Sequence, residues 1–167
     1  MKRSYALEQA DAAFFQSAPI TIVHAIESDV DPENLWCTLT ADDALVSWAR
    51  GLTRADWTST RPFGVGSTRV VEAAGGVASL KERFFRWDEG TQMSFYVEAA
   101  SLPGFRKFAE DVLVQQIPGG SRLTWTFAVE PQRWFSPALA LSRPVLHRVT
   151  KGWAQGAIDH ARQGVRR

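Results

Sequence analysis

The sequence predicts an α+β domain in which a long C-terminal helix packs on a curved antiparallel sheet of about seven strands. Two observations predict this class. Through the middle of the chain, short segments of alternating polarity are separated by turns that contain glycine, a pattern typical of consecutive hairpins. The last part of the chain carries apolar residues at helical spacing, and such a helix needs a sheet to cover its apolar side. A length of 167 residues fits one domain that buries its core without disulfides.

Residues 1–18 are expected to form an N-terminal arm or short helix ahead of a single domain over residues 19–167. The chain begins with basic residues, as a secretory signal does, but Glu8 and Asp11 interrupt the stretch that would have to be apolar. Apolar runs elsewhere end within a few residues, well short of the ~18–20 needed to span a bilayer. We therefore expect a cytoplasmic protein without stable membrane insertion.

The first strand is predicted over residues 20–28, where isoleucines fall on one side of an alternating pattern. Asp31 and Pro32 follow, and an aspartate N-cap with proline at the first helical position is typical of a helix start. A second short helix is predicted over residues 42–49, ending before Gly51. Two short helices are therefore expected between the first and second strands.

The remaining strands are delimited mainly by three dipeptides that favour tight turns: Gly75-Gly76, Glu89-Gly90 and Gly119-Gly120. Strands joined by such short turns pair antiparallel. The predicted strands cover residues 53–58, 67–73, 77–87, 91–99, 107–117 and 121–130.

The chain ends with a long helix, predicted at about residues 145–163 after a helical stretch that is interrupted at Pro144. We expect Trp153 to be its main inward anchor, because large aromatic side chains bury the most surface. The predicted inner stripe consists of residues spaced four apart: Val145, Val149, Trp153, Ala157 and Ala161.

Pairing residues outward from each turn predicts which side chains share the inner face of the sheet. This face is apolar except for four charged residues: Arg69, Glu82, Arg86 and Glu110. Buried charges must be paired, hydrogen-bonded or hydrated in a cavity. Three interpretations remain open: polar groups of a ligand pocket, a structural Arg69–Glu82 pair, or a register error caused by a bulge. With two-residue turns, the register pairs Arg69 with Glu82, Arg86 with Met93, Val112 with Phe127 and Val114 with Trp125.

Aromatic residues are abundant, since the chain has 7 Trp, 10 Phe and 2 Tyr. So much ring surface must line either a dense core or a cavity. We expect one contiguous internal cavity of roughly 300–1,000 Å³, the usual range for ligand pockets. Six rings are predicted to line it: Phe84, Phe95, Phe108, Trp125, Phe127 and Trp153.

Charge and motifs argue against several other classes of protein. A net charge of +1 argues against a nucleic-acid partner. The histidines His24, His147 and His160 are too scattered for a metal site, and the single Cys37 provides no thiolate pair. His24 lies on an apolar face, where we expect a satisfied core residue more often than a ligand. The chain has no nucleophile elbow and no phosphate-binding loop, and no cofactor is expected.

The order of elements and several motifs resemble the SRPBCC superfamily, with its START- or Bet v 1-like helix-grip fold, and within it the polyketide cyclase/dehydrase-like branch. The likeness covers about residues 20–163. The resemblance implies a curved sheet around a long C-terminal helix, a deep cavity between them, and small hydrophobic ligands. It brings no shared catalytic motif. The matching motifs are Asp31-Pro32-Glu33-Asn34-Leu35-Trp36, Gly64-Val65-Gly66-Ser67, Glu82-Arg83-Phe84-Phe85-Arg86-Trp87-Asp88 and Ser121-Arg122-Leu123-Thr124-Trp125.

Three functional hypotheses follow for a monomer or homodimer. The first is a carrier that binds a small hydrophobic molecule such as a lipid or polyketide. The second is a cyclase or dehydratase in which Glu82 or Glu110 acts as acid–base group, with a pKa raised by burial, and Arg69 or Arg86 holds a carbonyl oxygen. The third is a protein-interaction module whose own aromatic side chains fill the cavity.

Overall fold

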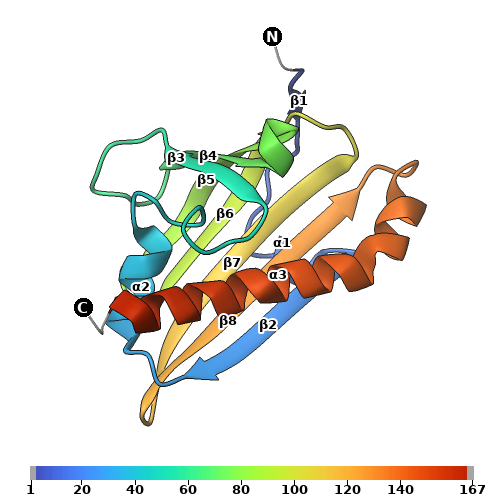
Figure 1. Cartoon of the computed structure of the whole chain (residues 1–167). Coiled ribbons are helices and arrows are strands. Elements are labelled where there is room, and N and C mark those ends of the chain that lie inside the picture. The colour runs from blue at the N-terminus through green and yellow to red at the C-terminus, as the bar shows by residue number, and fades with distance from the viewer. Residues whose placement is uncertain (1–2, 165–167) are drawn as a thin grey trace.

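The computed structural model describes residues 3–164. A strongly curved antiparallel sheet forms one layer, and the long helix α3 (Ser136–Gly164) runs across its concave inner face (Figure 1). This arrangement confirms the predicted α+β class. The seven main strands are β2 (Ile20–Ser28), β3 (Leu52–Trp57), β4 (Thr68–Ala73), β5 (Ala78–Asp88), β6 (Gln92–Ala100), β7 (Phe105–Ile117) and β8 (Gly120–Pro131). They lie in the order β2-β8-β7-β6-β5-β4-β3.

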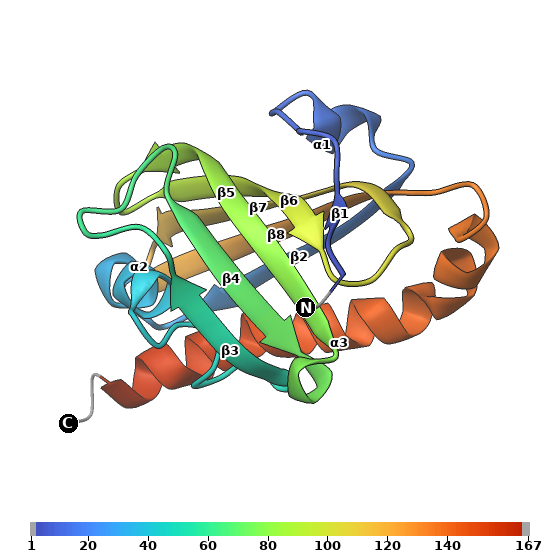
Figure 2. The same ribbon diagram turned by 90° about the horizontal axis from the view of Figure 1, so that it is seen from above.

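The N-terminal segment covers part of the convex outer face, on the opposite side of the sheet from α3 (Figure 2). It contains a two-residue strand, β1 (Tyr5–Ala6), which pairs with the end of β6, and a single helical turn, α1 (Phe14–Ser17). Phe14 is buried against Tyr96 and neighbouring alanines of the sheet. The arm therefore contains a strand as well as a short helix; residues 1–2 lie outside the described part.

The helix predicted after the first strand is α2 (Pro32–Thr40). Asp31 caps it by accepting a hydrogen bond from the Glu33 amide at 2.9 Å, and Pro32 occupies its first turn, as predicted. The prediction of a second helix over residues 42–49 is wrong, because this segment forms a series of turns. Leu45 has a φ of 74°, which takes the backbone out of the right-handed helical region.

The hairpin between β4 and β5 has the predicted register, in which Arg69 pairs with Glu82. The hairpin between β7 and β8 has its two-residue turn at Pro118-Gly119, one residue earlier than predicted, so that Ile117 pairs with Gly120 and every partner is shifted by two residues. Val112 therefore pairs with Trp125 rather than Phe127. A shift of two leaves every side chain on its predicted face, since the strand period is two.

The hairpin between β5 and β6 contains a bulge that moves Arg86 from the predicted inner face of the sheet to the outer face. Phe84 pairs with Phe95 as expected, but the register shifts between Phe84 and Arg86. Arg86 consequently pairs with Ser94 instead of Met93 and lies on the outer face, where its Nε bonds the Asp88 carboxylate at 2.7 Å. Its predicted place on the inner face is wrong, because one extra residue reverses the parity of the strand.

Helix α3 begins well before the predicted position and continues through Pro144. Proline has no N–H to donate to the carbonyl of Ala140, but Ala140 is exposed, so water can satisfy that carbonyl. Val145 and Val149 are 63% and 40% exposed, so their predicted inward position is wrong. A strict spacing of four advances about 40° around a helix at each step, and the stripe therefore turns away from the sheet. The buried residues are Leu139, Thr150, Ala154, Ala157, Ile158 and Ala161.

Small residues let the C-terminal half of α3 lie close to the turns that follow α2. A Cβ atom built on Gly156 would stand 2.5 Å from the carbonyl oxygen of Trp48, whereas one on Gly152 would meet nothing within 4 Å. Among the described helices, none is long and apolar enough to cross a bilayer.

Gly156→Ala should destabilise the protein by about 1–3 kcal/mol, because the added methyl group collides with backbone. Gly152→Ala is the matched control on the same helix and should stabilise by up to about 1 kcal/mol through helix propensity. Urea unfolding measures both. Equal stability of the two variants would show that α3 does not approach the Trp48 backbone this closely.

Candidate functional site

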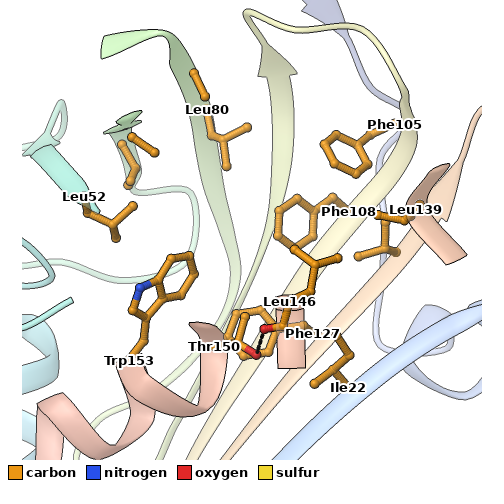
Figure 3. Close-up of a pocket in the computed structure, with 14 residues that line it drawn as sticks. Ile22, Leu52, Leu80, Phe105, Phe108, Phe127, Leu139, Leu146, Thr150 and Trp153 are labelled. Atoms are coloured by element: carbon orange, nitrogen blue, oxygen red, sulfur yellow. Dashed lines mark hydrogen bonds between the residues drawn. The ribbon is translucent and has the colours of Figure 1, made fainter. Parts of the chain in front are cut away.

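An apolar cavity of about 220 Å³ lies between the inner face of the sheet and the N-terminal half of α3. Figure 3 shows side chains from the helix and from both ends of the sheet converging on it. Its volume is smaller than the predicted range. The walls are Ile22, Leu52, Val71, Ala73, Ala78, Leu80, Phe105, Phe108, Phe127, Val129, Leu139, Leu146, Thr150 and Trp153.

A second, smaller cavity of about 60 Å³ continues toward the middle of the sheet. It shares Leu52, Val71, Leu80, Phe108 and Trp153 with the apolar cavity, so the two adjoin along a common wall. Its remaining lining is different in character, because it contains three ionisable groups and an indole. We call this part the polar end, formed by Arg69, Glu82, Glu110 and Trp125.

Arg69 and Glu82 form a buried ion pair at the polar end. The carboxylate oxygen Oε2 of Glu82 lies 2.8 Å from Nε and 2.7 Å from Nη2 of Arg69, and the two residues are 3% and 2% exposed respectively. Three rings surround the guanidinium, with centroids 5.0 Å (Trp57), 5.4 Å (Phe84) and 5.3 Å (Phe95) away. Such cation–π contacts offset part of the cost of removing the charge from water.

Glu110 is buried beside this pair and accepts a hydrogen bond at Oε2 from the Trp125 indole at 2.8 Å. Burial raises the pKa of Glu110 to about 8 and the negative charge of Glu82 adds to the shift, while the Trp125 hydrogen bond and Arg69 oppose it. Burial also raises the pKa of Glu82, and the attraction of Arg69 opposes that rise. Arg69 bonds Glu82 and not Glu110, so of the two coupled carboxyls Glu110 is the one that lacks a cationic partner and favours its protonated form.

In the described part of the chain, the second oxygen of Glu110, Oε1, has no counterpart to the Trp125 hydrogen bond. Among residues 3–164 no donor bonds Oε1 of Glu110, and every fully buried side-chain oxygen in that range has a partner. Because Glu110 lines the polar end, Oε1 is the oxygen of this carboxyl that is left for a ligand. A protonated carboxyl at this position can donate a hydrogen bond to a ligand oxygen.

The apolar cavity contains one polar side chain, Thr150, which the sequence interpretation did not single out. Its hydroxyl donates to the Leu146 carbonyl at 2.8 Å (Figure 3) and lies 2.7 Å from Nε2 of buried His24. Burial lowers the pKa of His24, and the nearby His147 and Lys151 lower it further. Thr150 lies one helical turn after Leu146, and the correct phase of α3 would have been needed to find it.

The structure brings together most of the predicted site residues. Phe108, Phe127 and Trp153 line the apolar cavity, and four others form the polar end. Phe84 and Phe95 do not line either cavity, because they pack around the Arg69 guanidinium. Trp153 points inward but stays half-buried, and its indole donates to the Arg50 carbonyl at 3.0 Å. Within residues 3–164, no three His, Cys, Asp or Glu side chains are placed to hold a metal ion.

Residues 19–165 match the family described as polyketide cyclase / dehydrase and lipid transport. The chain belongs to this family. The match confirms the resemblance seen in the motifs and spans almost the whole chain. Uncharacterized proteins from Mycobacterium bovis and Mycobacterium tuberculosis are 38% identical to it over 143 residues, which cover 86% of this chain and 85% of theirs.

Solved structures share the family fold at low sequence identity. The Zhui aromatase/cyclase from Streptomyces sp. R1128 superposes with a TM-score of 0.74 at 12% identity, covering 87% of this chain and 95% of that one. A START superfamily protein from Mycobacterium smegmatis gives a TM-score of 0.66 at 13% identity, covering 86% and 97%. At these identities the likeness shows the fold alone, and it confirms the helix-grip architecture.

Arg69→Met should destabilise the protein by about 3–5 kcal/mol, because it leaves Glu82 buried without its partner. The double variant Arg69→Met/Glu82→Leu should recover most of that loss, since both charges are then gone. Arg54→Met is the control, because the Arg54–Asp56 pair is about half exposed and should contribute less than ~1 kcal/mol. Denaturant unfolding that gives Arg69→Met no larger cost than Arg54→Met would contradict burial of the pair.

Glu110→Gln should flatten the pH dependence of stability between pH 4.5 and about 8. A carboxyl whose pKa is raised in the folded state binds more protons there, so its contribution is complete below the unfolded pKa and is lost as pH rises through the folded pKa. The pKa of His24 is lowered, so its contribution to stability changes with pH in the opposite direction. The quantity to measure is therefore the difference in free energy of unfolding between wild type and Glu110→Gln at each pH. Free energies of unfolding that stay parallel across this range would show that Glu110 does not hold the proton.

Proposed function

We propose that the protein binds and carries a small hydrophobic molecule that has a neutral polar group, between the sheet and α3. One observation supports this most strongly: the apolar cavity, with Thr150 as its one polar side chain, adjoins a polar end whose charges compensate each other. The apolar walls suit a hydrocarbon body, and the few polar groups suit its orientation. The predictions of a cytoplasmic location, of no nucleic-acid partner and of a monomer or homodimer stay predictions.

The size of the cavity favours compact ligands. A dry cavity of about 150 Å³ is enough to bind benzene, and the apolar cavity here has about 220 Å³. A compound with one or two rings, or a short chain, fits this volume. The cavity exceeds the methyl-sized voids that the filled interaction module would require, and this supports the carrier hypothesis over the module.

The charge of the polar end favours a neutral head group. Arg69 already bonds Glu82, so an anionic ligand would gain little attraction and would meet two carboxyl groups. A carbonyl or hydroxyl oxygen can instead accept a hydrogen bond from protonated Glu110. We therefore place the polar group of the ligand beside Oε1 of Glu110.

Neutral probes should bind more tightly than anionic ones of the same shape. In titrations followed by tryptophan fluorescence, naphthyl methyl ketone should bind at least about tenfold more tightly than naphthoate, because the charged acid would be buried beside two carboxyl groups without a cation of its own. Leu80 lines both cavities, so Leu80→Trp should fill them and abolish probe binding. Leu102→Trp is the control, because Leu102 is 47% exposed and lies outside both cavities, and this variant should bind as wild type does. Native mass spectrometry of protein purified from its source would then identify a retained ligand.

Equal binding of the ketone and the acid would contradict the neutral head group while leaving the carrier function intact. Probe binding that survives Leu80→Trp unchanged would contradict the cavity itself.

A second candidate function is acid–base catalysis of cyclisation or dehydration, and one observation favours it: the carboxyl of Glu110 borders the cavity with a pKa near 8. Arg86 takes no part, because it lies on the outer face. Under this alternative, Glu110→Gln retains ligand binding but leaves a bound polyketone unchanged. Recovery of the ligand unchanged from wild type as well would support the carrier.

A further inference from the structure

Residues 131–158 contain four Lys or Arg residues and no Asp or Glu, in a chain whose net charge is only +1. This stretch comprises the end of β8, the loop after it and most of α3. Across residues 3–164, carboxylates pair with many arginines, but none pairs with these four cations. They are Arg133, Arg143, Arg148 and Lys151. Their charge is therefore available to an external partner.

The same stretch exposes an apolar surface that the fold does not use. Leu141, Val145 and Val149 lie at successive helical turns of α3 and are 84%, 63% and 40% exposed, and Trp134 just before the helix is 65% exposed. These are four of the nine large hydrophobic side chains that are exposed in the described range. Scattered exposed hydrophobics are ordinary, but a cluster marks an interaction site.

The exposed cluster continues the wall of the apolar cavity. Val145 and Val149 are followed directly by Leu146 and Thr150, which line the cavity. Trp134 contacts the ring of Phe135 at 5.4 Å, and Phe135 packs on cavity-lining Phe105 at 5.6 Å. The residues that close this end of the cavity therefore directly neighbour the exposed apolar side chains in the chain, with the cavity on the inner side of α3 and the exposed side chains on its solvent side.

We propose that this face, formed by Trp134 and the exposed side of α3 over residues 141–151, docks on the surface of an anionic lipid bilayer. Apolar side chains beside lysine and arginine suit insertion at the level of the lipid headgroups, and cations near the surface are attracted by anionic lipids. Tryptophan is enriched at this depth. The helix stays packed on the sheet, and the docking is peripheral. The inference goes beyond the proposed carrier function and does not depend on it.

Charge distinguishes a bilayer from the other occupants of such a face. A second copy of the chain would bring two sets of unpaired cations together, and like charges across an interface are unfavourable. A nucleic acid would use the cations but not the exposed Leu141 and Val145. An anionic bilayer satisfies both features at once.

The experiment is sedimentation with vesicles of phosphatidylcholine alone or mixed with phosphatidylglycerol. Wild-type protein should bind the anionic vesicles and not the neutral ones, and added salt should weaken the binding. Arg148→Glu/Lys151→Glu and Leu141→Ser/Val145→Ser should each weaken binding by about tenfold or more. Val65→Ser is the matched control, because Val65 is 70% exposed on a loop far from α3 in sequence and should bind like wild type.

All these positions are exposed, so thermal unfolding should be unchanged and a loss of binding reports the surface itself. Wild-type protein that ignores anionic vesicles at low salt would overturn the proposal. Variants that bind as wild type does would also overturn it. Light scattering that shows a dimer converted to monomer by Leu141→Ser/Val145→Ser, without vesicle binding, would assign the face to a second copy instead. Binding of naphthyl methyl ketone should be the same in every variant, and this separates docking from the carrier function.

Discussion

Arg69 and Glu82 face each other across two strands in a place that water scarcely reaches. Two charges in such a place are tolerated only when each has its partner and its hydrogen bonds. The pair therefore constrains its surroundings. A slip of β4 along β5 would separate the charges, and so their register is fixed more firmly than apolar contacts alone would fix it. Rings from three strands enclose the guanidinium, and the pKa of Glu110 beside the pair is raised by burial and by the charge of Glu82.

The cavity follows from how α3 meets the curved sheet. In its C-terminal half three of the buried residues are alanines, Ala154, Ala157 and Ala161, beside the single larger Ile158, and the helix lies close to the turns after α2. In its N-terminal half, Leu139 and Leu146 meet Phe105 and Phe108 from β7. These larger side chains hold the helix away from the sheet and leave space between their tips. Helix α3 is therefore closely packed at its C-terminal end, and the apolar cavity lies under its N-terminal half.

The sequence was sufficient to predict what depends on local chemistry. Short glycine turns set the parity of each hairpin, and parity alone brings Arg69, Glu82 and Glu110 onto one face. The parts that failed depend on tertiary contacts. The bulge beside Phe85 and the positive φ of Leu45 leave no mark in a single sequence. The phase of α3 depends on which side packs against the sheet, and equal spacing of apolar residues could not distinguish Val145 from Leu146.

The bulge in β5 divides that strand into two segments of opposite phase. Before it, even-numbered residues such as Glu82 and Phe84 face the helix; after it, Trp87 does so and packs against the ring of Phe84 at 5.4 Å. The indoles of Trp87 and Trp36 then donate to the two oxygens of Glu89 at 2.6 and 2.8 Å, which ties the following turn to α2. A single extra residue, Phe85, therefore decides which side chains in the last part of β5 face the helix. Deleting Phe85 would exchange inward-facing and outward-facing positions over the last residues of β5, whereas substituting it would leave their orientation unchanged.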